Sequence, residues 1–344
     1  MTGFRWGGGG AAGRRLRPLD AQVAVITGGS RGIGRAAARR LAREGARVVV
    51  LARDEEGLRE TVRLVEEDGG TARHLVVDVT DADAVRTAVD RVEEWFGRID
   101  TWVGNAGVLL YSRVADTRPQ EFRDVLEVNL IGQIHGIQAA LPALRRAGGG
   151  ALVIVSSVEA VAALPMHGAY AASKHALEGA LDALRRELGD EYPQISITSV
   201  RPAVIDTPIY RHARNRMVWR PTAPPPTYAP EVVAEAIAFA ATHPVRTIHA
   251  GGGGRLLVAA QQAAPGIVDA VFRRLGTDIM HTDDPDGTGG GDLRVGAADR
   301  SSTGALPRRG RAVSIYTWLA VRPRVRLGLT AAALVWAGSR LRRR

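Results

Sequence analysis

Hydrophobic residues along the chain fall into short β-branched runs that alternate with longer stretches of helical periodicity. The runs predict strands at 23–27, 47–52, 72–77, 101–103, 151–155 and 195–200, and the longer stretches predict helices at 33–44, 55–68, 81–96, 120–146 and 169–188. Continuous apolar strands separated by helices indicate a parallel sheet covered on both faces. We therefore expect an α/β fold, a Rossmann-like doubly wound sheet of about seven strands, with ligands bound at the carboxyl ends of the strands.

The pattern changes after Thr207. Five prolines at 221–230 exclude a regular helix there. Beyond them we expect a helix at 231–242, a last strand at 247–250, a loop at 251–254 and one or two helices within 261–275. The predicted organisation is a disordered basic leader at 1–20, a Rossmann-like domain at 21–276, a flexible linker at 277–311 and a basic, partly apolar C-terminal tail at 312–344.

Composition narrows the classes of function. The chain has 45% hydrophobic and 24% charged residues, which is typical of a globular protein. It has no cysteine, so disulfides and thiolate metal sites are excluded, and its eight histidines show no metal-like spacing. The net charge of +10 is concentrated in the two ends, which favours solubility or an anionic membrane surface over a nucleic-acid groove. The first 18 residues lack the apolar run of a secretory signal.

A glycine-rich segment, Gly28, Gly32 and Gly34, lies between the first predicted strand and the first predicted helix. Glycines let a pyrophosphate approach the backbone closely, and the helix N-terminus offers free N–H groups. Three glycines alone are weak evidence for a nucleotide site. Their position in the first strand-to-helix turn makes a dinucleotide site a firmer prediction.

The Gly-x-x-x-Gly-x-Gly spacing resembles that of the short-chain dehydrogenase/reductase family. Further landmarks of that family follow in order: Asp78, Asn105-Ala106-Gly107, Asn129, Ser157, Tyr170-Ala-Ala-Ser-Lys174, Pro202 and Thr207. The resemblance covers roughly residues 20–260. It implies a nicotinamide-dependent oxidoreductase that acts on a carbonyl or an alcohol of a small molecule.

The resemblance also implies the residues that bind the cofactor. They are Gly28, Ser30, Arg31, Gly32, Ile33, Gly34, Arg53, Asp78, Val79, Asn105, Ala106, Gly107, Tyr170, Lys174, Pro202, Ile205 and Thr207. An acidic residue after the second strand would favour NAD(H), but Ala52 and Arg53 stand there. Arg31 and Arg53 could hold a 2′-phosphate, so NADP(H) is predicted over NAD(H). The alternative is that both are surface arginines of an arginine-rich chain.

Tyr170 and Lys174 are the predicted centre of the proton chemistry. Residues four apart share a helix face, and a nearby cation lowers the pKa of a tyrosine from about 10. Lys174 is also the only lysine in the sequence, which indicates a position where arginine cannot serve. By resemblance, Ser157 would hold the substrate oxygen, with Ser156 the competing candidate, and Asn129 would hold a water. A non-catalytic dinucleotide sensor or membrane-associated scaffold is the alternative function.

Two residues depart from the family pattern. Gly104 stands where the family usually has asparagine, so a hydrogen bond that supports the sheet is expected to be missing. Ala203 stands where the family has glycine, so the backbone beside the nicotinamide is expected to shift. Neither change removes a reacting group.

Substrate preference is predicted to lie in Tyr111, 158–168 and 205–228. Bulky residues there predict a lipophilic substrate, unless they only pack the lid onto the domain: Leu164, Met166, Tyr210, Met217 and Trp219. His167, His175 and His212 are predicted at the surface or the pocket rim.

In the tail, the apolar stretch 327–338 would span only about 18 Å as a helix, against a bilayer core of about 30 Å. Its basic flanks favour an interfacial anchor, and the alternative is a helix packed on the protein or on a partner. We expect a cytoplasmic protein, associated with the inner face of the membrane if the tail is an anchor, and a homo-oligomer.

Overall fold

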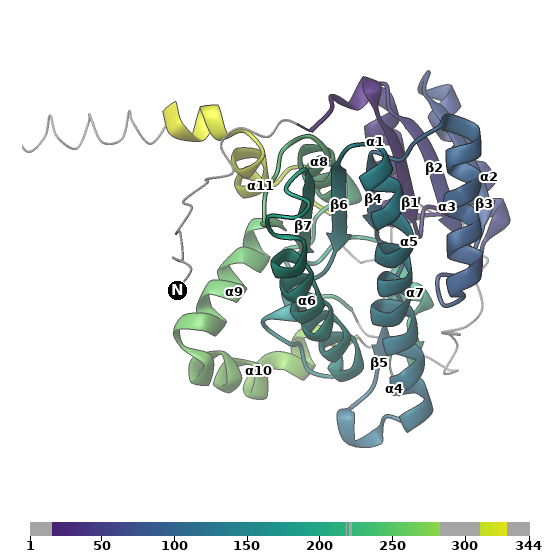
Figure 1. Ribbon diagram of the computed structural model, residues 1–344. Helices are drawn as coiled ribbons and strands as arrows, with labels where there is room; N and C mark the ends of the chain where they lie inside the picture. Colours follow the sequence, from purple (N-terminus) through teal and green to yellow (C-terminus); the bar gives the residue numbers. More distant parts are fainter. Residues whose placement is uncertain (1–15, 218, 220–221, 283–309, 329–344) are drawn as a thin grey trace, which may run out of the picture.

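The computed structural model describes residues 16–217, 219, 222–282 and 310–328. Its main feature is a seven-stranded parallel sheet in the order β3-β2-β1-β4-β6-β7-β9 (Figure 1). The strands are β1 (Val23–Thr27), β2 (Arg47–Ala52), β3 (Thr71–Val76), β4 (Thr101–Gly104), β6 (Gly150–Val155), β7 (Ile195–Pro202) and β9 (Thr247–Ala250). The predicted α/β, doubly wound fold is confirmed.

Helices cover both faces of this sheet. One face carries α1 (Gly32–Arg43), α2 (Glu55–Glu67) and α8 (Pro230–Thr242), and the other carries α3 (Ala82–Phe96), α5 (Gly132–Arg146) and α6 (Gly168–Leu188). Side chains along β1 point alternately to the two faces of the sheet. Ala24 and Ile26 pack on one face, and Val23 and Val25 pack on the other. Strands buried on both faces explain the continuous apolar runs in the sequence.

The long helix predicted at 120–146 is interrupted. It begins as α4 (Pro119–Leu126), passes through a π-helical turn, η3 (Glu127–Ile131), and continues as α5. Asn129 lies in the π turn. Such turns occur frequently at functional sites, because they change the direction of side chains along a helix.

A second, two-stranded sheet was not anticipated. β5 (Leu110–Tyr111) pairs in parallel with β8 (Arg214–Asn215). The short helix α7 (Ile209–His212) precedes β8 in the chain. Strands of two residues carry no periodicity, so the hydrophobic pattern could not reveal them.

The predicted loop at 251–254 is wrong. Gly252 begins α9 (Gly252–Ala263), which is followed by α10 (Pro265–Met280). The glycines serve close packing here: a Cβ at Gly254 would lie 2.7 Å from both the Ala203 Cβ and the Val158 Cγ1. Of the four glycines at 251–254, only Gly251 has a positive φ, of 111°. α10 ends at Met280, so its last four residues lie in the range that was predicted as a linker.

The described part of the tail packs on the domain beside β9 and α9. Gly251 N–H donates to the Thr317 Oγ1 at 2.9 Å, and Gly252 N–H donates to the Ser314 Oγ at 3.2 Å. Ser314 caps α11 (Ile315–Ala320), and Arg322 pairs with Glu235 of α8 at 3.0 Å. We call residues 310–322 the C-terminal strap.

The ends of the chain are described only in part. Leu19, assigned to a disordered leader, is 4% exposed and packs in the core. Residues 1–15 and 329–344, with most of the apolar stretch 327–338, lie outside the described residues. Among the helices that the structure describes, none combines the length and hydropathy needed to span a bilayer.

Candidate active site

A cavity of about 600 Å³ opens at the carboxyl ends of the strands, where the fold predicts a ligand site. Of the predicted site residues, Gly34 and Asn129 do not line it. Those that do are Gly28, Ser30, Arg31, Gly32, Ile33, Arg53, Asp78, Val79, Asn105, Ala106, Gly107, Ser157, Tyr170, Lys174, Pro202, Ile205 and Thr207. The cavity therefore brings together predicted site residues that are up to 179 positions apart, from Gly28 to Thr207.

The glycine-rich turn at the start of α1 needs glycine for its geometry. Gly28 and Gly32 have φ of 65° and 51°, in the left-handed region. A Cβ at Gly28 would lie 2.9 Å from the Ala106 Cα, and one at Gly34 would collide with the Gly28 carbonyl. Gly34 thus keeps the turn tight, while Gly28 and Gly32 leave the backbone open to a bound phosphate.

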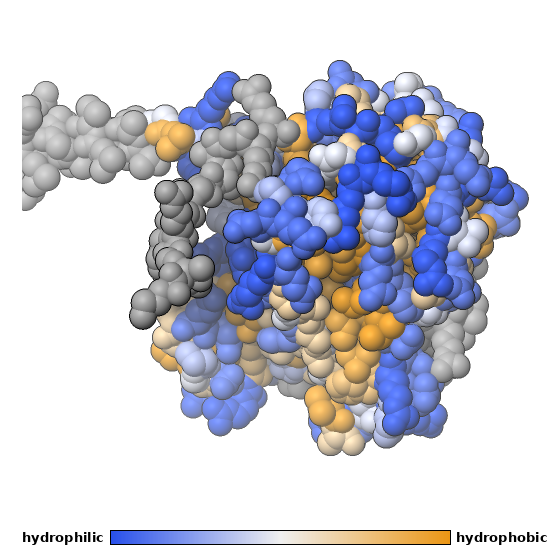
Figure 2. Space-filling view, viewed as in Figure 1, coloured by the Kyte–Doolittle hydropathy of each residue, from blue (hydrophilic) through white to orange (hydrophobic). Residues whose placement is uncertain are grey.

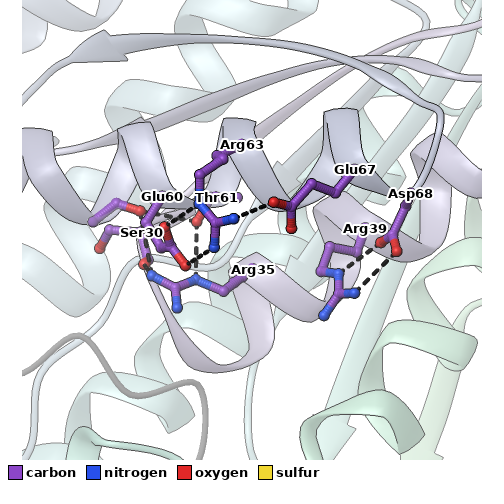
Figure 3. Close-up of polar contacts among 9 residues, drawn as sticks. Ser30, Arg35, Arg39, Glu60, Thr61, Arg63, Glu67 and Asp68 are labelled. Carbon is purple, nitrogen blue, oxygen red and sulfur yellow. Dashed lines mark hydrogen bonds and ion pairs between the residues drawn. The ribbon is translucent and has the colours of Figure 1, made fainter.

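A buried arginine supports this turn from behind (Figure 3). Arg35 is 3% exposed, donates from Nε to the Thr61 Oγ1 at 3.0 Å, and also donates to the Ser30 carbonyl. The Thr61 hydroxyl in turn lies 2.9 Å from the Gly29 carbonyl. Arg35 was not among the predicted site residues, because one arginine among many carries no signal of burial in the sequence.

The first departure from the family pattern is compensated. A Cβ at Gly104 would collide with the Gln133 side chain, which is 2% exposed. Gln133 Nε2 donates to the Ala106 carbonyl at 2.7 Å, and Asn105 Nδ2 donates to the Thr27 carbonyl at 3.0 Å. The support that we expected to be missing is therefore supplied from α5.

The second departure is compensated as well. The Ala203 Cβ lies 2.7 Å from the positions where Gly251 and Gly254 would carry a Cβ. Ala203 N–H still donates to the Ala250 carbonyl at 2.8 Å. The methyl group thus replaces the family's glycine only because two glycines face it.

At one end of the cavity, two arginines are each paired with a carboxylate. Arg31 pairs with Asp54, which also caps α2 by accepting from Gly57 N–H at 3.1 Å. Arg53 lies 3.7 Å from Asp78. Both predicted arginines therefore face the cavity with part of their charge compensated, which the sequence did not reveal.

Lys174 and Tyr170 lie in the first turns of α6, where Lys174 is buried and Tyr170 is partly buried. Lys174 Nζ donates to the Val155 carbonyl at 3.0 Å and lies 5.7 Å from the centre of the Tyr170 ring. Burial lowers the pKa of Lys174 to about 8, although the charge of Glu178 opposes this.

The expected lowering of the Tyr170 pKa is wrong for this structure. Burial and then the negative charge of Glu159 raise the pKa of its phenol above the ordinary value, and the contact with Ser157 only partly offsets them. The Lys174 ammonium donates to the Val155 carbonyl and lies 5.7 Å from the centre of the phenol ring, and its charge does not outweigh the effects of burial and of Glu159 on the pKa of Tyr170.

The two serines at the end of β6 differ in surroundings. The Ser157 hydroxyl accepts from Glu159 N–H at 3.0 Å. Its hydrogen bond with the Tyr170 phenol lowers the pKa of that phenol. Ser156 instead lies on the side of the Glu178 carboxylate, where it helps to lower the pKa of that carboxyl. The alternation along the strand thus turns Ser157, and not Ser156, towards Tyr170.

Asn129 is fully buried behind the cavity wall. Its Nδ2 donates to the Val108 carbonyl at 3.0 Å and to the Ser173 Oγ at 3.1 Å, and its Oδ1 accepts from Val108 N–H at 2.8 Å. Both amide hydrogens are therefore committed to protein atoms. The predicted water would have to be held by a carbonyl oxygen, and the direct effect of Asn129 is to fix Val108, which lines the cavity.

The substrate end of the cavity differs from the prediction. Leu164 and Tyr210 line it, whereas Tyr111, Met166, Met217 and Trp219 lie behind its wall. Val158 and Glu159 of the predicted segment 158–168 also line it, together with Leu109, Leu257 and Phe272, which lie outside the segments that the sequence singled out. His167 is 3% exposed, so it is a buried wall residue and not a rim residue. Among the described residues, no cluster of His, Asp or Glu could hold a metal ion.

Comparison with known proteins adds three findings. Residues 22–217 match the family model for short chain dehydrogenase. An uncharacterized oxidoreductase of Bacillus subtilis, YxnA, is 32% identical over 332 residues, which are 95% of this chain and 92% of that protein. A short chain dehydrogenase from Mycobacterium paratuberculosis bound to NAD is 31% identical, with a TM-score of 0.60 over 68% of this chain and 97% of that chain.

A second solved structure is similar. The alcohol dehydrogenase of the archaeon Thermococcus sibiricus, complexed with 5-hydroxy-NADP, is 29% identical, with a TM-score of 0.58 over 66% of this chain and 95% of that chain. The family model covers more than half of the chain, and these structures hold a nicotinamide cofactor or a derivative of one. The chain is an oxidoreductase that belongs to the short-chain dehydrogenase family.

Proposed function

We propose that the protein is an NADP(H)-dependent carbonyl reductase or alcohol dehydrogenase with Tyr170 as its general acid and base. The observation that carries the proposal is the convergence of Ser157, Tyr170 and Lys174 on one cavity that also holds the glycine-rich turn. The bound cofactor would supply the hydride. Gly28, Gly32 and Ile33 would hold its pyrophosphate at the α1 N-terminus, and Lys174 would bind the ribose next to the nicotinamide.

The protein's own part in the reaction is to handle one proton. In reduction, the Tyr170 phenol donates its proton to the substrate oxygen, while the Ser157 hydroxyl hydrogen-bonds that oxygen as charge develops on it. The raised pKa of Tyr170 keeps the phenol protonated near neutral pH. A protonated phenol is the form that reduction consumes, so we expect the protein to favour carbonyl reduction over alcohol oxidation at neutral pH.

The preference for NADP(H) is part of the proposal. Arg31 and Arg53 both line the end of the cavity where a 2′-phosphate would lie, and a guanidinium can bind a phosphate through two hydrogen bonds. Their carboxylate partners, Asp54 and Asp78, compete for that role. Arg53→Asp should therefore lower the ratio of NADP to NAD affinity by about tenfold or more, and unchanged affinities would overturn the preference.

The substrate is proposed to be lipophilic, because apolar side chains form most of the wall beyond Tyr170. They include Leu109, Leu164, Leu257 and Phe272. The test is a panel of ketones, aldehydes and alcohols of increasing apolar size, with consumption of NADPH followed by absorbance. Tyr170→Phe should lower turnover by about a thousandfold and leave NADPH affinity nearly unchanged, because the phenol moves the proton while most of the predicted cofactor contacts come from other residues of the cavity. Tyr192→Phe, on the far side of the domain, is the matched control. Full turnover in Tyr170→Phe would overturn the mechanism.

Self-association and peripheral membrane contact are also proposed. Figure 2 shows hydrophobic side chains gathered near the ends of α4, α5 and α6, where Val114 and Ile131 are 67% and 36% exposed. On the strap side, Ile315 is 77% and Trp318 41% exposed. Sedimentation, which measures the oligomeric state, tests whether the surface with Val114 and Ile131 is used for self-association. Removal of residues 329–344, which leaves α11 in place, should lower binding to anionic lipid vesicles if the tail is an anchor, and unchanged binding would overturn the anchor.

A further inference from the structure

Glu159 and His167 form a buried pair that the proposed reaction does not use. His167 Nδ1 lies 3.0 Å from the Glu159 Oε1 and 3.1 Å from its Oε2, and the two residues are 3% and 7% exposed, respectively. Both line the cavity beside Ser157 and Tyr170. A carboxylate is costly to bury, so its presence in the wall of a largely apolar site needs an explanation.

The pair connects the two reacting side chains through the loop between them. Glu159 N–H donates to the Ser157 hydroxyl at 3.0 Å, and the Glu159 carboxylate accepts from Leu164 N–H at 3.3 Å as well as from His167. His167 directly precedes α6, and its carbonyl accepts from Ala171 N–H at 2.8 Å. Tyr170 lies in the first turn of that helix. Glu159 is therefore hydrogen-bonded to Ser157 through its backbone N–H, and through its carboxylate to His167, the residue that precedes the helix carrying Tyr170.

The backbone of this loop is held in a costly conformation next to His167. Met166 has φ of 65°, in the left-handed region that non-glycine residues seldom adopt. Its carbonyl accepts from Ser112 N–H at 2.9 Å. Such a conformation persists only where surrounding contacts fix it, and the Glu159–His167 pair is one of those contacts.

The carboxylate also acts through its charge. Every tyrosine around this end of the cavity, Tyr111 from β5, Tyr170 from α6 and Tyr210 from α7, has its pKa raised by burial and further raised by Glu159. Other titratable groups near the phenol are His167, whose ring centre is 6.3 Å from that of Tyr170, and Lys174 on the same helix. His212 of α7 also lines the cavity. The positive charge of Lys174, whose ammonium donates to the Val155 carbonyl, opposes the charge of Glu159 at the phenol without outweighing burial and Glu159.

We propose that Glu159, held by His167, is a positioning residue that aligns Ser157 with Tyr170 and places a negative charge which keeps the phenol protonated and disfavours anionic substrates. The inference rests on the proposed function, because it assumes that Tyr170 transfers the proton. It adds a substrate class: uncharged carbonyl compounds, with no carboxylate or phosphate close to the reacting carbon. A like charge there would lie against Glu159 in a site shielded from water.

The first test is the pH profile of Glu159→Gln, which keeps the shape of the side chain and removes its charge. Without the nearby negative charge, the phenol loses its proton at lower pH. Alcohol oxidation, which needs the ionised phenol, should therefore begin at lower pH, and carbonyl reduction, which needs the protonated phenol, should fall off at lower pH. We expect both limbs to move down by about half a pH unit or more. Glu187→Gln, an exposed position on α6, is the matched control and should leave both limbs in place.

Two further variants separate charge from position. Glu159→Asp keeps the charge but shortens the reach to His167 and Leu164, so kcat should fall about tenfold while the limbs of the pH profile stay near those of the wild type. His167→Asn keeps a donor at the place of Nδ1 and cannot be protonated. It should retain the wild-type limbs, which would show that the carboxylate and not the imidazole sets them.

The substrate class is tested with a matched pair, a keto acid and its neutral ester. The wild type should prefer the ester in kcat/KM, and Glu159→Gln should reduce that preference by about tenfold. If the pH limbs and the ester preference of Glu159→Gln both match the wild type, the pair is only structural and the inference is overturned, whereas turnover that depends on Tyr170 would still support the proposed function. Absence of wild-type turnover on every carbonyl and alcohol would overturn the proposed function and the inference together.

Discussion

At the cofactor end of the cavity, the walls come from the segments that directly follow β1, β2, β3 and β4. At the substrate end they come from the loop after β6, α7, the proline-rich segment, α9, α10 and, behind α9, the C-terminal strap. The first region is formed largely by backbone atoms held at fixed distances by glycines and buried polar side chains. The second is formed by side chains of segments that are far apart in the sequence.

The difference shows which changes each region can tolerate. In the cofactor region an added methyl group meets main-chain atoms that cannot move, as at Gly28. In the substrate region, Ala203 in place of a glycine is tolerated because Gly251 and Gly254 leave room. The cofactor end is therefore constrained residue by residue, whereas the substrate end can change as long as its segments change together.

The largest effect is expected at Gly28. Gly28→Ala forces a Cβ to within 2.9 Å of the Ala106 Cα and puts a non-glycine residue at φ of 65°. We expect a loss of about 2 kcal/mol in the free energy of unfolding and at least a tenfold weaker affinity for NADPH. Denaturant unfolding and fluorescence titration measure the two quantities.

Gly266→Ala is the control for this prediction. It lies in α10, has no atom within 4 Å of its added Cβ, and should be neutral or slightly stabilising. Equal effects of the two substitutions would contradict the distinction between a rigid cofactor end and an adaptable substrate end.

A smaller effect is expected where the strap meets the substrate end. Thr317→Val removes the oxygen that accepts from Gly251 N–H and leaves that buried donor without a partner, at a cost of about 1–3 kcal/mol. Because α9 begins at Gly252, substrate KM should rise by about fivefold while NADPH affinity changes little. Steady-state kinetics measure the substrate KM, and cofactor titration measures the NADPH affinity. Thr87→Val, on the exposed side of α3, should change neither.

The smallest effect is expected for the free energy of unfolding at acid pH, and it concerns His249 on β9. Burial, and then Arg201 and Arg255, lower the pKa of His249 on β9 from 6.5 to about 4. Between these values the unfolded chain binds a proton that the folded chain does not, so this residue lowers the free energy of unfolding as the pH falls and has no such effect above about pH 6.5. His249→Asn should remove part of the acid sensitivity. A variant that loses as much stability as the wild type between about pH 7 and pH 5 would show that His249 does not contribute.

The central sheet could be predicted from the sequence because its inner strands are buried on both faces and leave continuous apolar runs, whereas the edge strands β3 and β9 are only partly buried. The strands at 23–27, 47–52 and 247–250 have the bounds that we expected. The π turn around Asn129 could not be predicted, since one extra residue in a helical turn barely changes the hydrophobic period. The helix at Gly252 was missed because glycines that allow close packing look the same in a sequence as glycines that allow a turn.

The cofactor end could be predicted because its residues follow strands at set distances along the chain. The substrate end could not. The pairing of Glu159 with His167 left no signal in the sequence, because it depends on the path of the loop between them. The carboxylates opposite Arg31 and Arg53 were equally hidden, since a sequence gives the sign of a charge and not its partner.

The burial of the single lysine has a practical consequence. A chain with one ε-amino group, isotopically labelled, gives one side-chain ammonium signal, and here that signal comes from Lys174, next to Tyr170. Its pKa of about 8 makes the amine nucleophilic at mildly alkaline pH, while its 3% exposure limits the access of reagents. The occupancy of the cleft can thus be followed at one nitrogen atom, without a fluorescent tag, a substrate or a turnover assay.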